Sequence, residues 1–112
     1  MSGRFDELPA EEVYAGVVRR SFSSDKATVT RYSFAPGATF PLHRHPQQQI
    51  TLIEAGDVDM TVGDHAAPMC AGDWSVIEAD VDHGIRGGTG GAQVLAIVIP
   101  ARASADAYSV VG

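Results

Sequence analysis

The chain has 112 residues, enough to bury one hydrophobic core but not two. Eight Lys and Arg against 14 Asp and Glu give a formal net charge of -6, which argues against nucleic-acid or anionic-membrane partners, because both need clustered positive charge. No apolar stretch approaches the roughly 20 residues that span a bilayer and the N-terminus lacks the apolar run of a secretory signal, so we expect a soluble, cytoplasmic protein.

Short runs rich in Val, Ile, Thr and aromatic residues alternate with turn residues along the chain. This pattern is typical of an all-β sandwich or barrel, and we find no helical periodicity. Turns are predicted at 36–37, 55–57, 63–64, 71–73 and 87–91. In chain order, the predicted strands are 17–22, 27–34, 49–54, 58–62, 74–78 and 92–99, with shorter pieces near Phe40 and His83.

The last predicted strand is apolar at every position from Val94 to Ile99, whereas a strand with one face in water alternates. One side of it must face the barrel interior, and the other must be covered by a second sheet or a partner subunit. Because an uncovered apolar face costs roughly 25 cal/mol per Å², we expect a homodimer. The first dozen residues and the tail after Pro100 are expected to wrap the outside of the barrel or to fray.

One cluster of side chains points to metal binding. His43 and His45 are one residue apart, and in a strand that spacing sends both to the same face. Gln49 lies an even number of positions further on, so its side chain faces the same side if the extended run continues through Pro46. His83 can reach the same point inside the barrel from a separate strand. Three imidazole nitrogens and one amide oxygen suit a divalent transition metal, whether Fe, Ni, Mn, Zn or Cu. Because histidine binds metal only when neutral, binding should weaken as the pH falls through about 6.5.

The pattern His-x-His alone leaves open a pair of exposed or hydrogen-bonded histidines. Other candidates have simpler interpretations: His65 is expected in a solvated hairpin tip, and the lone Cys70 as a small buried apolar residue. Trp74 is expected in the core or at an interface and Met60 in the packed core, with the lining of the substrate cavity as the alternative for both. Three arginines are suited to hold a carboxylate beside the barrel mouth, with exposure on an outer face as the alternative for each, namely Arg31, Arg86 and Arg102.

The glycine and histidine spacing resembles the first conserved motif of the cupin superfamily: Gly37, five residues, His43, one residue, His45, three residues, Gln49, six residues and Gly56, with Gln where Glu is commonest. Gly72 and His83 match a second motif, in which Glu78, Asp80 and Gly87 replace the usual Pro, Gly and Asn. The resemblance implies one domain over 1–112, a double-stranded β-helix (jelly-roll) barrel with its core at about 16–102 and both arms outside it. It also implies a metal deep in the open end and a frequent dimer.

Among small single-domain cupins, the chain resembles the group that includes the uronate-ketonising enzymes of pectin and alginate breakdown. The similar stretches are 16–20, 43–46, Gln49, 83–86 and 100–102. In that group an Asp on the last strand and an Arg after the Pro are implicated in catalysis. Arg102 matches the arginine and is thereby implied as a catalytic residue. Ala96 stands at the Asp position, and Val98 stands where an aromatic residue is usual.

A neutral ligand set leaves a bound ion its full double charge, which favours Lewis-acid chemistry. The predicted function is therefore isomerisation, tautomerisation or a related proton transfer on a small anionic carbonyl or sugar-acid-like substrate. Since Ala96 cannot transfer a proton, the base is a metal-bound hydroxide, the substrate itself or another side chain such as Glu78. A metal-dependent dioxygenase and a non-catalytic module that binds a small ligand or a metal are the alternatives.

Overall fold

The computed structural model describes residues 1–104 and 107–111. Within these residues the chain forms one turn of 3-10 helix and nine strands, so the all-β fold predicted from the sequence is confirmed. No helix in the described residues is long and apolar enough to cross a membrane. In chain order the elements are η1 (Phe5–Glu7), β1 (Glu11–Tyr14), β2 (Val17–Ser23), β3 (Thr28–Phe34), β4 (Thr39–Arg44), β5 (Gln48–Val62), β6 (His65–Cys70), β7 (Trp74–Ile77), β8 (His83–Ile99) and β9 (Ser109–Val110).

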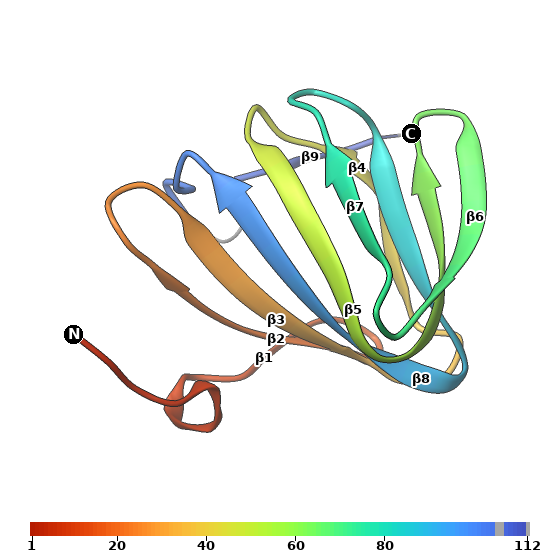
Figure 1. The fold of residues 1–112 in the computed structure, drawn as a ribbon, viewed down its shortest axis with the longest axis horizontal. Coiled ribbons are helices and arrows are strands. Elements are labelled where there is room, and N and C mark those ends of the chain that lie inside the picture. Colours follow the sequence, from red (N-terminus) through yellow and green to blue (C-terminus); the bar gives the residue numbers. More distant parts are fainter. Residues whose placement is uncertain (105–106, 112) are drawn as a thin grey trace.

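The strands form one sheet that folds over on itself into two layers, because β5 and β8 are long enough to run through both (Figure 1). In the first layer, residues 48–53 of β5 pair with 94–99 of β8, and the layer extends to β7 on one side and to β3, β2 and β1 on the other. In the second layer, residues 58–62 of β5 pair with 83–87 of β8, flanked by β6 on one side and by β4 and β9 on the other. This arrangement is the expected jelly roll.

The bends of β5 and β8 correct the sequence prediction. Residues 55–57 and 87–91 were expected to be turns between separate strands, but both segments lie inside continuous strands whose register shifts there. Gly56 and Gly91 both have φ of +73°. A Cβ atom on Gly56 would collide with the carbonyl oxygen of Gly91. The glycines are therefore needed where two bent strands approach closely, and not for a chain reversal.

The core lies between the two layers and consists of the inward side chains of both. Aromatic rings from β3 and β4 pack edge to face, with the centroids of Tyr32 and Phe40 5.7 Å apart. From the last strand, Val94, Ala96 and Val98 are buried in this core, whereas Ile99 on the opposite face is exposed. The described chain thus covers only one side of the apolar strand fully.

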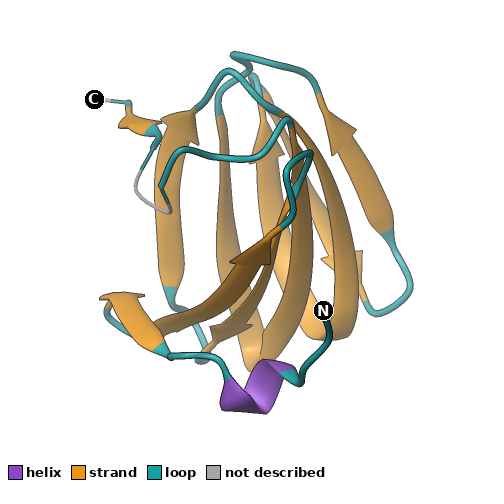
Figure 2. Ribbon diagram, turned by 90° about the vertical axis from the view of Figure 1, so that its left-hand side faces the viewer, coloured by secondary structure: helices purple, strands orange, loops and turns teal. Residues whose placement is uncertain are grey.

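Both arms pack against the barrel. At the N-terminus, Arg20 Nη1 donates hydrogen bonds to the carbonyl oxygens of Phe5, Asp6 and Leu8 at 3.2, 2.7 and 3.0 Å, which holds η1 on the first layer (Figure 2). At the C-terminus, β9 pairs with β4, so the described end of the tail adds a strand instead of fraying. Three short strands, β1, β6 and β9, were not predicted.

Two residues expected in the interior lie outside it. Trp74 is 68% exposed, because β7 is an edge strand and Trp74 shares the outer face with Leu52, its partner in the β5–β7 pairing. Cys70, the last residue of β6, is also exposed. His65 is exposed as expected and begins β6, and Met60 is buried as expected.

Candidate metal centre

The segment that follows β4 carries the predicted ligands across from one layer to the other. Residues 45–47 interrupt the extended run, since β4 ends at Arg44 and β5 begins at Gln48. Alternate side chains nevertheless stay buried from His43 to Ile53. His43 therefore belongs to the second layer and Gln49 to the first, with His45 between them, so the site spans the open end of the barrel.

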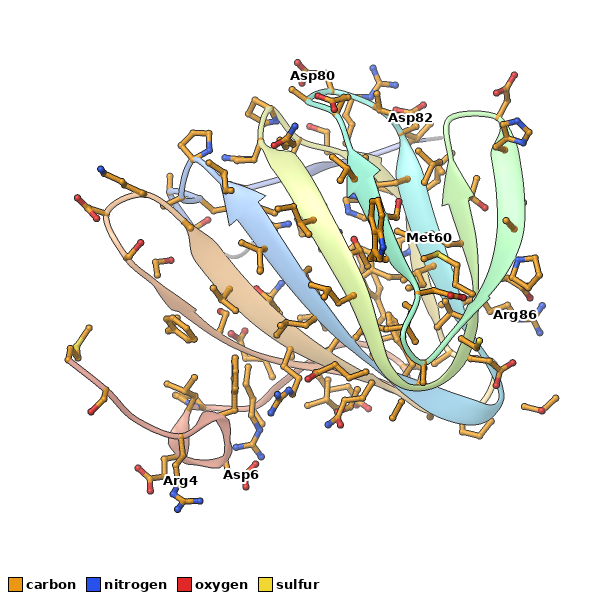
Figure 3. The ribbon with its side chains drawn as sticks, in the orientation of Figure 1. Arg4, Asp6, Met60, Asp80, Asp82 and Arg86 are labelled. Atoms are coloured by element: carbon orange, nitrogen blue, oxygen red, sulfur yellow. The ribbon has the colours of Figure 1, made fainter. Side chains whose placement is uncertain are left out.

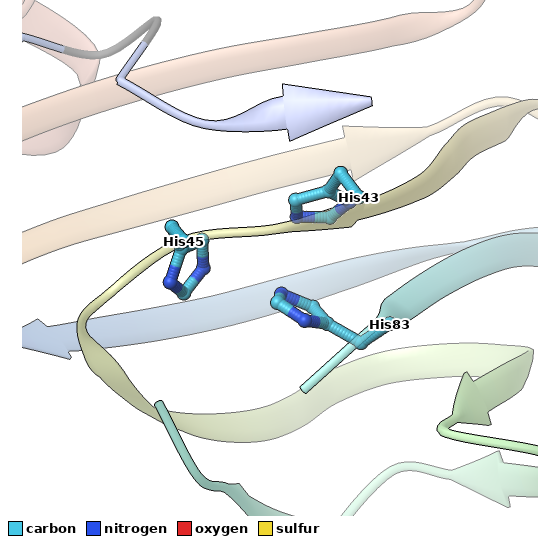
Figure 4. Close-up of side chains that lie close together, drawn as sticks. All are labelled: His43, His45 and His83. Carbon is cyan, nitrogen blue, oxygen red and sulfur yellow. The ribbon is translucent and has the colours of Figure 1, made fainter. Parts of the chain in front are cut away.

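The structure brings the three predicted histidines together (Figure 4). One ring nitrogen from each of His43, His45 and His83 lies within 4.8 Å of the others, and the side chains are 6, 3 and 2% exposed. The shortest separation between ring centroids is 4.1 Å, between His43 and His83. These two residues are directly opposed in the β4–β8 pairing, and this register places their imidazoles side by side.

Backbone carbonyl groups fix the tautomer of all three imidazoles. The Nδ1 atoms of His43, His45 and His83 lie 2.8, 3.0 and 2.9 Å from the carbonyl oxygens of Pro41, Gln47 and Val81. Because a carbonyl oxygen can only accept, each Nδ1 carries the proton and each Nε2 keeps a lone pair. Hydrogen bonds of this kind orient histidine ligands in metal sites.

The fourth predicted ligand, Gln49, lies at the same place. Its Oε1 atom is 3.1 Å from Nε2 of His45, and its Nε2 atom donates to Oγ1 of Thr51 at 2.9 Å. Gln49 and Thr51 are both buried. Thr51 therefore orients the amide, a role that sequence reasoning did not assign to it.

Burial keeps the cluster uncharged near neutral pH. Burial, followed by repulsion from His83, lowers the pKa of His43 to about 3, and burial lowers the pKa of His83 to about 4. Burial, followed by the positive charge of Arg102, also lowers the pKa of His45. The Nε2 atom of His83 is buried without any hydrogen-bond partner. Buried neutral imidazoles with free lone pairs fit a divalent transition metal, so these residues can hold one.

Of the three arginines considered, only Arg102 lies near the cluster. Its charge contributes to the lowered pKa of each histidine, and its backbone N–H donates to Oγ1 of Thr28 at 3.0 Å. Arg31 instead forms a two-point ion pair with Glu54 on the outer face, at 2.9 and 3.1 Å. Arg86 is exposed and points away from the barrel (Figure 3). The prediction that Arg31 or Arg86 holds a carboxylate beside the barrel mouth is therefore wrong.

A narrow cavity of about 30 Å³ continues from the cluster into the core, with room for little more than water. Its wall includes His43, His83, Thr51 and Ala96, so Ala96 faces the site as expected. Glu78 does not: it is exposed and accepts a hydrogen bond from Gln48 at 3.3 Å. No Asp or Glu is among the buried residues of the described chain, which rules out Glu78 as the inward base.

Sequence reasoning missed two residues beside the cluster. The ring of Tyr108 packs 5.2 Å from that of His43, and its hydroxyl forms a 2.9 Å hydrogen bond with the hydroxyl of Tyr14. Tyr108 lies outside both motifs, so no local signal marks it. Gln47 is also buried, and its Oε1 atom has no hydrogen-bond partner. Its parity with His45 and Gln49 was the signal that could have identified it.

Comparison with known proteins places this architecture in a family. A family model described as a cupin domain matches residues 30–100. The chain therefore belongs to the cupin family. No curated protein matches the sequence at a significant level.

Solved structures share the fold. An RmlC-like cupin from Shewanella frigidimarina has a TM-score of 0.83 and 22% identity, covering 90% of this chain and 91% of that one. Oxalate decarboxylase from Lactobacillus farciminis has a TM-score of 0.87 and 20% identity over 96% of this chain, and a Bacillus subtilis oxalate decarboxylase with Mn(II) centres has 0.88 and 18% over the same share. The chain spans 35% and 31% of these two decarboxylases.

Proposed function

We propose that this cupin is an enzyme that binds one divalent transition metal through His43, His45, His83 and Gln49 and acts on a small anionic carbonyl or sugar-acid-like substrate. The observation that carries the proposal is the neutral donor set, with three buried imidazoles of lowered pKa and one amide oxygen. A divalent ion held by these residues would supply a strong Lewis acid for isomerisation, tautomerisation or a related proton transfer.

Arg102 is the residue we propose for holding the anionic group of the substrate. Its positive charge helps to lower the pKa of all three imidazoles, which supports a role beside the cluster. A guanidinium binds a carboxylate through two parallel hydrogen bonds, which would fix the orientation of the substrate beside the histidines. Resemblance to the uronate-ketonising cupins supports the same role.

Proton transfer is the step for which the described residues are least equipped. Ala96 stands on the cavity wall where the resemblance expects Asp, and Glu78 points outward. A positioned acid or base typically contributes about 10²- to 10⁴-fold to a rate, so ketonisation of uronates by this protein should be slow. The lack of a buried carboxylate in the described chain also favours a second candidate function, a non-catalytic module that binds a sugar acid through the metal and Arg102.

The test begins with metal analysis of protein purified without added metal. The loaded protein is then assayed for loss of the ultraviolet absorbance of an unsaturated uronate and for oxygen uptake. Metal-dependent loss of absorbance supports the proposal, whereas uronate binding without turnover favours the binding module. Metal-dependent oxygen consumption with an organic substrate would instead make the protein a dioxygenase. A protein that binds no divalent metal at pH 7.5 would refute all three.

We also propose that the protein is a homodimer formed through the outer face of the first layer. On this face the exposed side chains of Leu52, Trp74, Val76 and Ile99 lie on adjacent strands β5, β7 and β8. In the register, Leu52 lies between Trp74 and Leu95, so the apolar surface is continuous. A second copy would cover it by the same face, as two-fold symmetric dimers do.

A further inference from the structure

A second hollow opens on the side of the barrel, where the two layers separate between β6 and β7. It has a volume of about 440 Å³, within the usual range for small-molecule sites. Its walls are mainly apolar and include Met60, Val62, Ala67 and Met69, with Trp74 and Asp73 at the rim. We call this hollow the side groove. No step of the proposed reaction uses it.

Two residues of the side groove connect it to the metal centre. Met60 is 4% exposed and lines both the groove and the narrow cavity below the histidines, so its flexible thioether side chain lies between the two spaces. Val62 lies directly opposite His83 in the β5–β8 pairing. Side chains opposed in this way are neighbours on the same face of the sheet. The groove therefore begins beside a predicted metal ligand.

The sizes of the two spaces determine what each can accept. The inner cavity of about 30 Å³ cannot enclose an organic molecule, whereas the open side groove of about 440 Å³ has room for a ring or a branched alkyl chain along its wall. The thioethers of Met60 and Met69 and the indole of Trp74 favour an uncharged apolar group, and the carboxylate of Asp73 at the rim disfavours a second anionic group.

We infer that the side groove binds an uncharged aromatic or branched aliphatic group, the apolar arm of a substrate whose anionic head lies at the metal centre. This inference rests on the proposed function for the position of the head, but the groove itself can be tested without it. Trp74 determines specificity for the arm, and the flexible side chain of Met60 turns aside to let one molecule reach both the groove and the metal centre.

The first experiment tests the groove alone. Benzyl alcohol, a neutral probe, is titrated into the purified full-length protein without added metal. Trp74 is the only tryptophan, so its indole N–H gives a single NMR signal, and the methyl signals of Met60 and Met69 report the inner wall. We expect all three signals to shift saturably. Trp74→Ala should weaken the response of the methionine methyl groups at least fivefold. Val76→Ala, on the same strand with its side chain outside the groove, should leave it unchanged.

The second experiment tests the link to the metal centre in zinc-loaded protein. The affinity of 4-methyl-2-oxopentanoate is compared by calorimetry with that of pyruvate, which has the same head and no branched arm. We expect the branched acid to bind at least tenfold more tightly and Trp74→Ala to remove most of this preference without changing the affinity for pyruvate.

The outcomes separate the two proposals. Saturable binding of benzyl alcohol with no binding of either acid would contradict the substrate class proposed for the metal centre and leave the groove site intact. Equal affinities for the two acids would overturn the arm–head arrangement. If benzyl alcohol causes no saturable shift up to about 50 mM, the inference fails. It also fails if the wild-type indole signal depends on protein concentration and Trp74→Ala and Val76→Ala alter the response of the methionine methyl groups equally, because a second copy then covers the groove.

Discussion

Nε2 of His45 and Oε1 of Gln49 lie 3.1 Å apart, although neither atom has a proton to share. The proton of His45 is on Nδ1, which donates to the carbonyl oxygen of Gln47, and the amide protons of Gln49 are directed to Thr51. Two lone pairs that face each other at this distance repel. The arrangement is the one expected of two atoms that bind the same cation.

Loss of one of these atoms should weaken metal binding. We expect His45→Ala to lower the affinity for Zn²⁺ at least tenfold, because one of four ligands is removed. His65→Ala is the matched control, since His65 is exposed and lies outside the cluster. Competition titrations with a chromogenic chelator at pH 7.5 measure both variants. Equal affinity of the two variants would show that His45 is not a ligand.

The pH dependence of metal binding should differ from the sequence-based expectation of weakening near pH 6.5. Burial lowers the pKa of His43 to about 3 and that of His83 to about 4, so protons do not compete with the metal at these residues until the pH approaches 4. Because burial lowers the pKa of His45 as well, we expect the affinity for Zn²⁺ to fall less between pH 7.5 and 5.5 than it would with exposed histidines. A tenfold loss across this interval would mean that the histidines titrate like exposed ones.

The same lowered pKa values should make the metal-free protein less stable in mild acid. In the unfolded chain these histidines have a pKa near 6.5, so between pH 6.5 and about 4 the unfolded state binds protons that the folded state does not. Stability is therefore full above pH 6.5 and falls as the pH decreases, by up to about 1.4 kcal/mol per pH unit for each histidine. Urea unfolding of the metal-free protein at pH 7.5 and 5.5 measures this loss of stability. An unchanged urea midpoint would contradict the lowered pKa values of His43 and His83.

Disruption of the outer face should separate the proposed dimer. We expect light scattering of the wild type to give twice the 11.8 kDa chain mass, and Leu52→Glu to give the monomer, because it buries a charge at the centre of the apolar face. Ala66→Glu, on exposed β6 of the second layer, should remain dimeric. A wild type of monomer mass at micromolar concentration would refute the assembly.

Restoring a carboxylate to the cavity should raise uronate ketonisation. Ala96 is 3% exposed and lines the cavity below the histidines. Ala96→Asp is expected to increase metal-dependent turnover of an unsaturated uronate by about 10²-fold or more. Ala96→Asn has nearly the same volume but no carboxylate, so it should give no gain. If the asparagine variant gains as much as the aspartate variant, proton transfer is not the cause.

The bend of β5 offers a test of the fold itself. At Gly63, φ is +62° and a Cβ would meet nothing within 4 Å, so Gly63→Ala should cost only about 1–2 kcal/mol for the left-handed backbone. Gly56→Ala carries a similar penalty at φ +73° and adds the collision with the Gly91 carbonyl. We expect it to cost at least about 2 kcal/mol more, measured by urea unfolding. Equal costs would show that the strands can separate there.

The parts of the site that follow from local spacing were predictable. The even spacing of His43, His45 and Gln49 predicted that their side chains lie on one face of the chain. The structure brings them together with His83, even though the strand breaks at Pro46. Tyr108 was not predictable, because the long-range return of the tail to β4 places it. The lowered pKa values were also missed, since they arise from burial by residues distant in sequence.

In the fold, too, features set by local sequence were predictable and features set by distant contacts were not. Binary pattern and turn residues indicated most strands, but glycine accommodates a bend inside a strand as readily as a turn, so Gly56 and Gly91 were taken for strand ends. Trp74 was assigned to the core because its side chain is apolar. Its exposure follows from the edge position of β7, which depends on the topology and not on the residue.

Because β5 and β8 each run through both layers, neither layer contains a complete set of strands of its own. The folded core can therefore form only when segments distant in sequence meet, such as residues 48–53 with 94–99. Chains dominated by such non-local pairings fold slowly, in milliseconds to seconds, because loop closure precedes any stabilising contact. The same continuity makes partial unfolding of one layer costly, so the molecule should lose both layers in one cooperative transition.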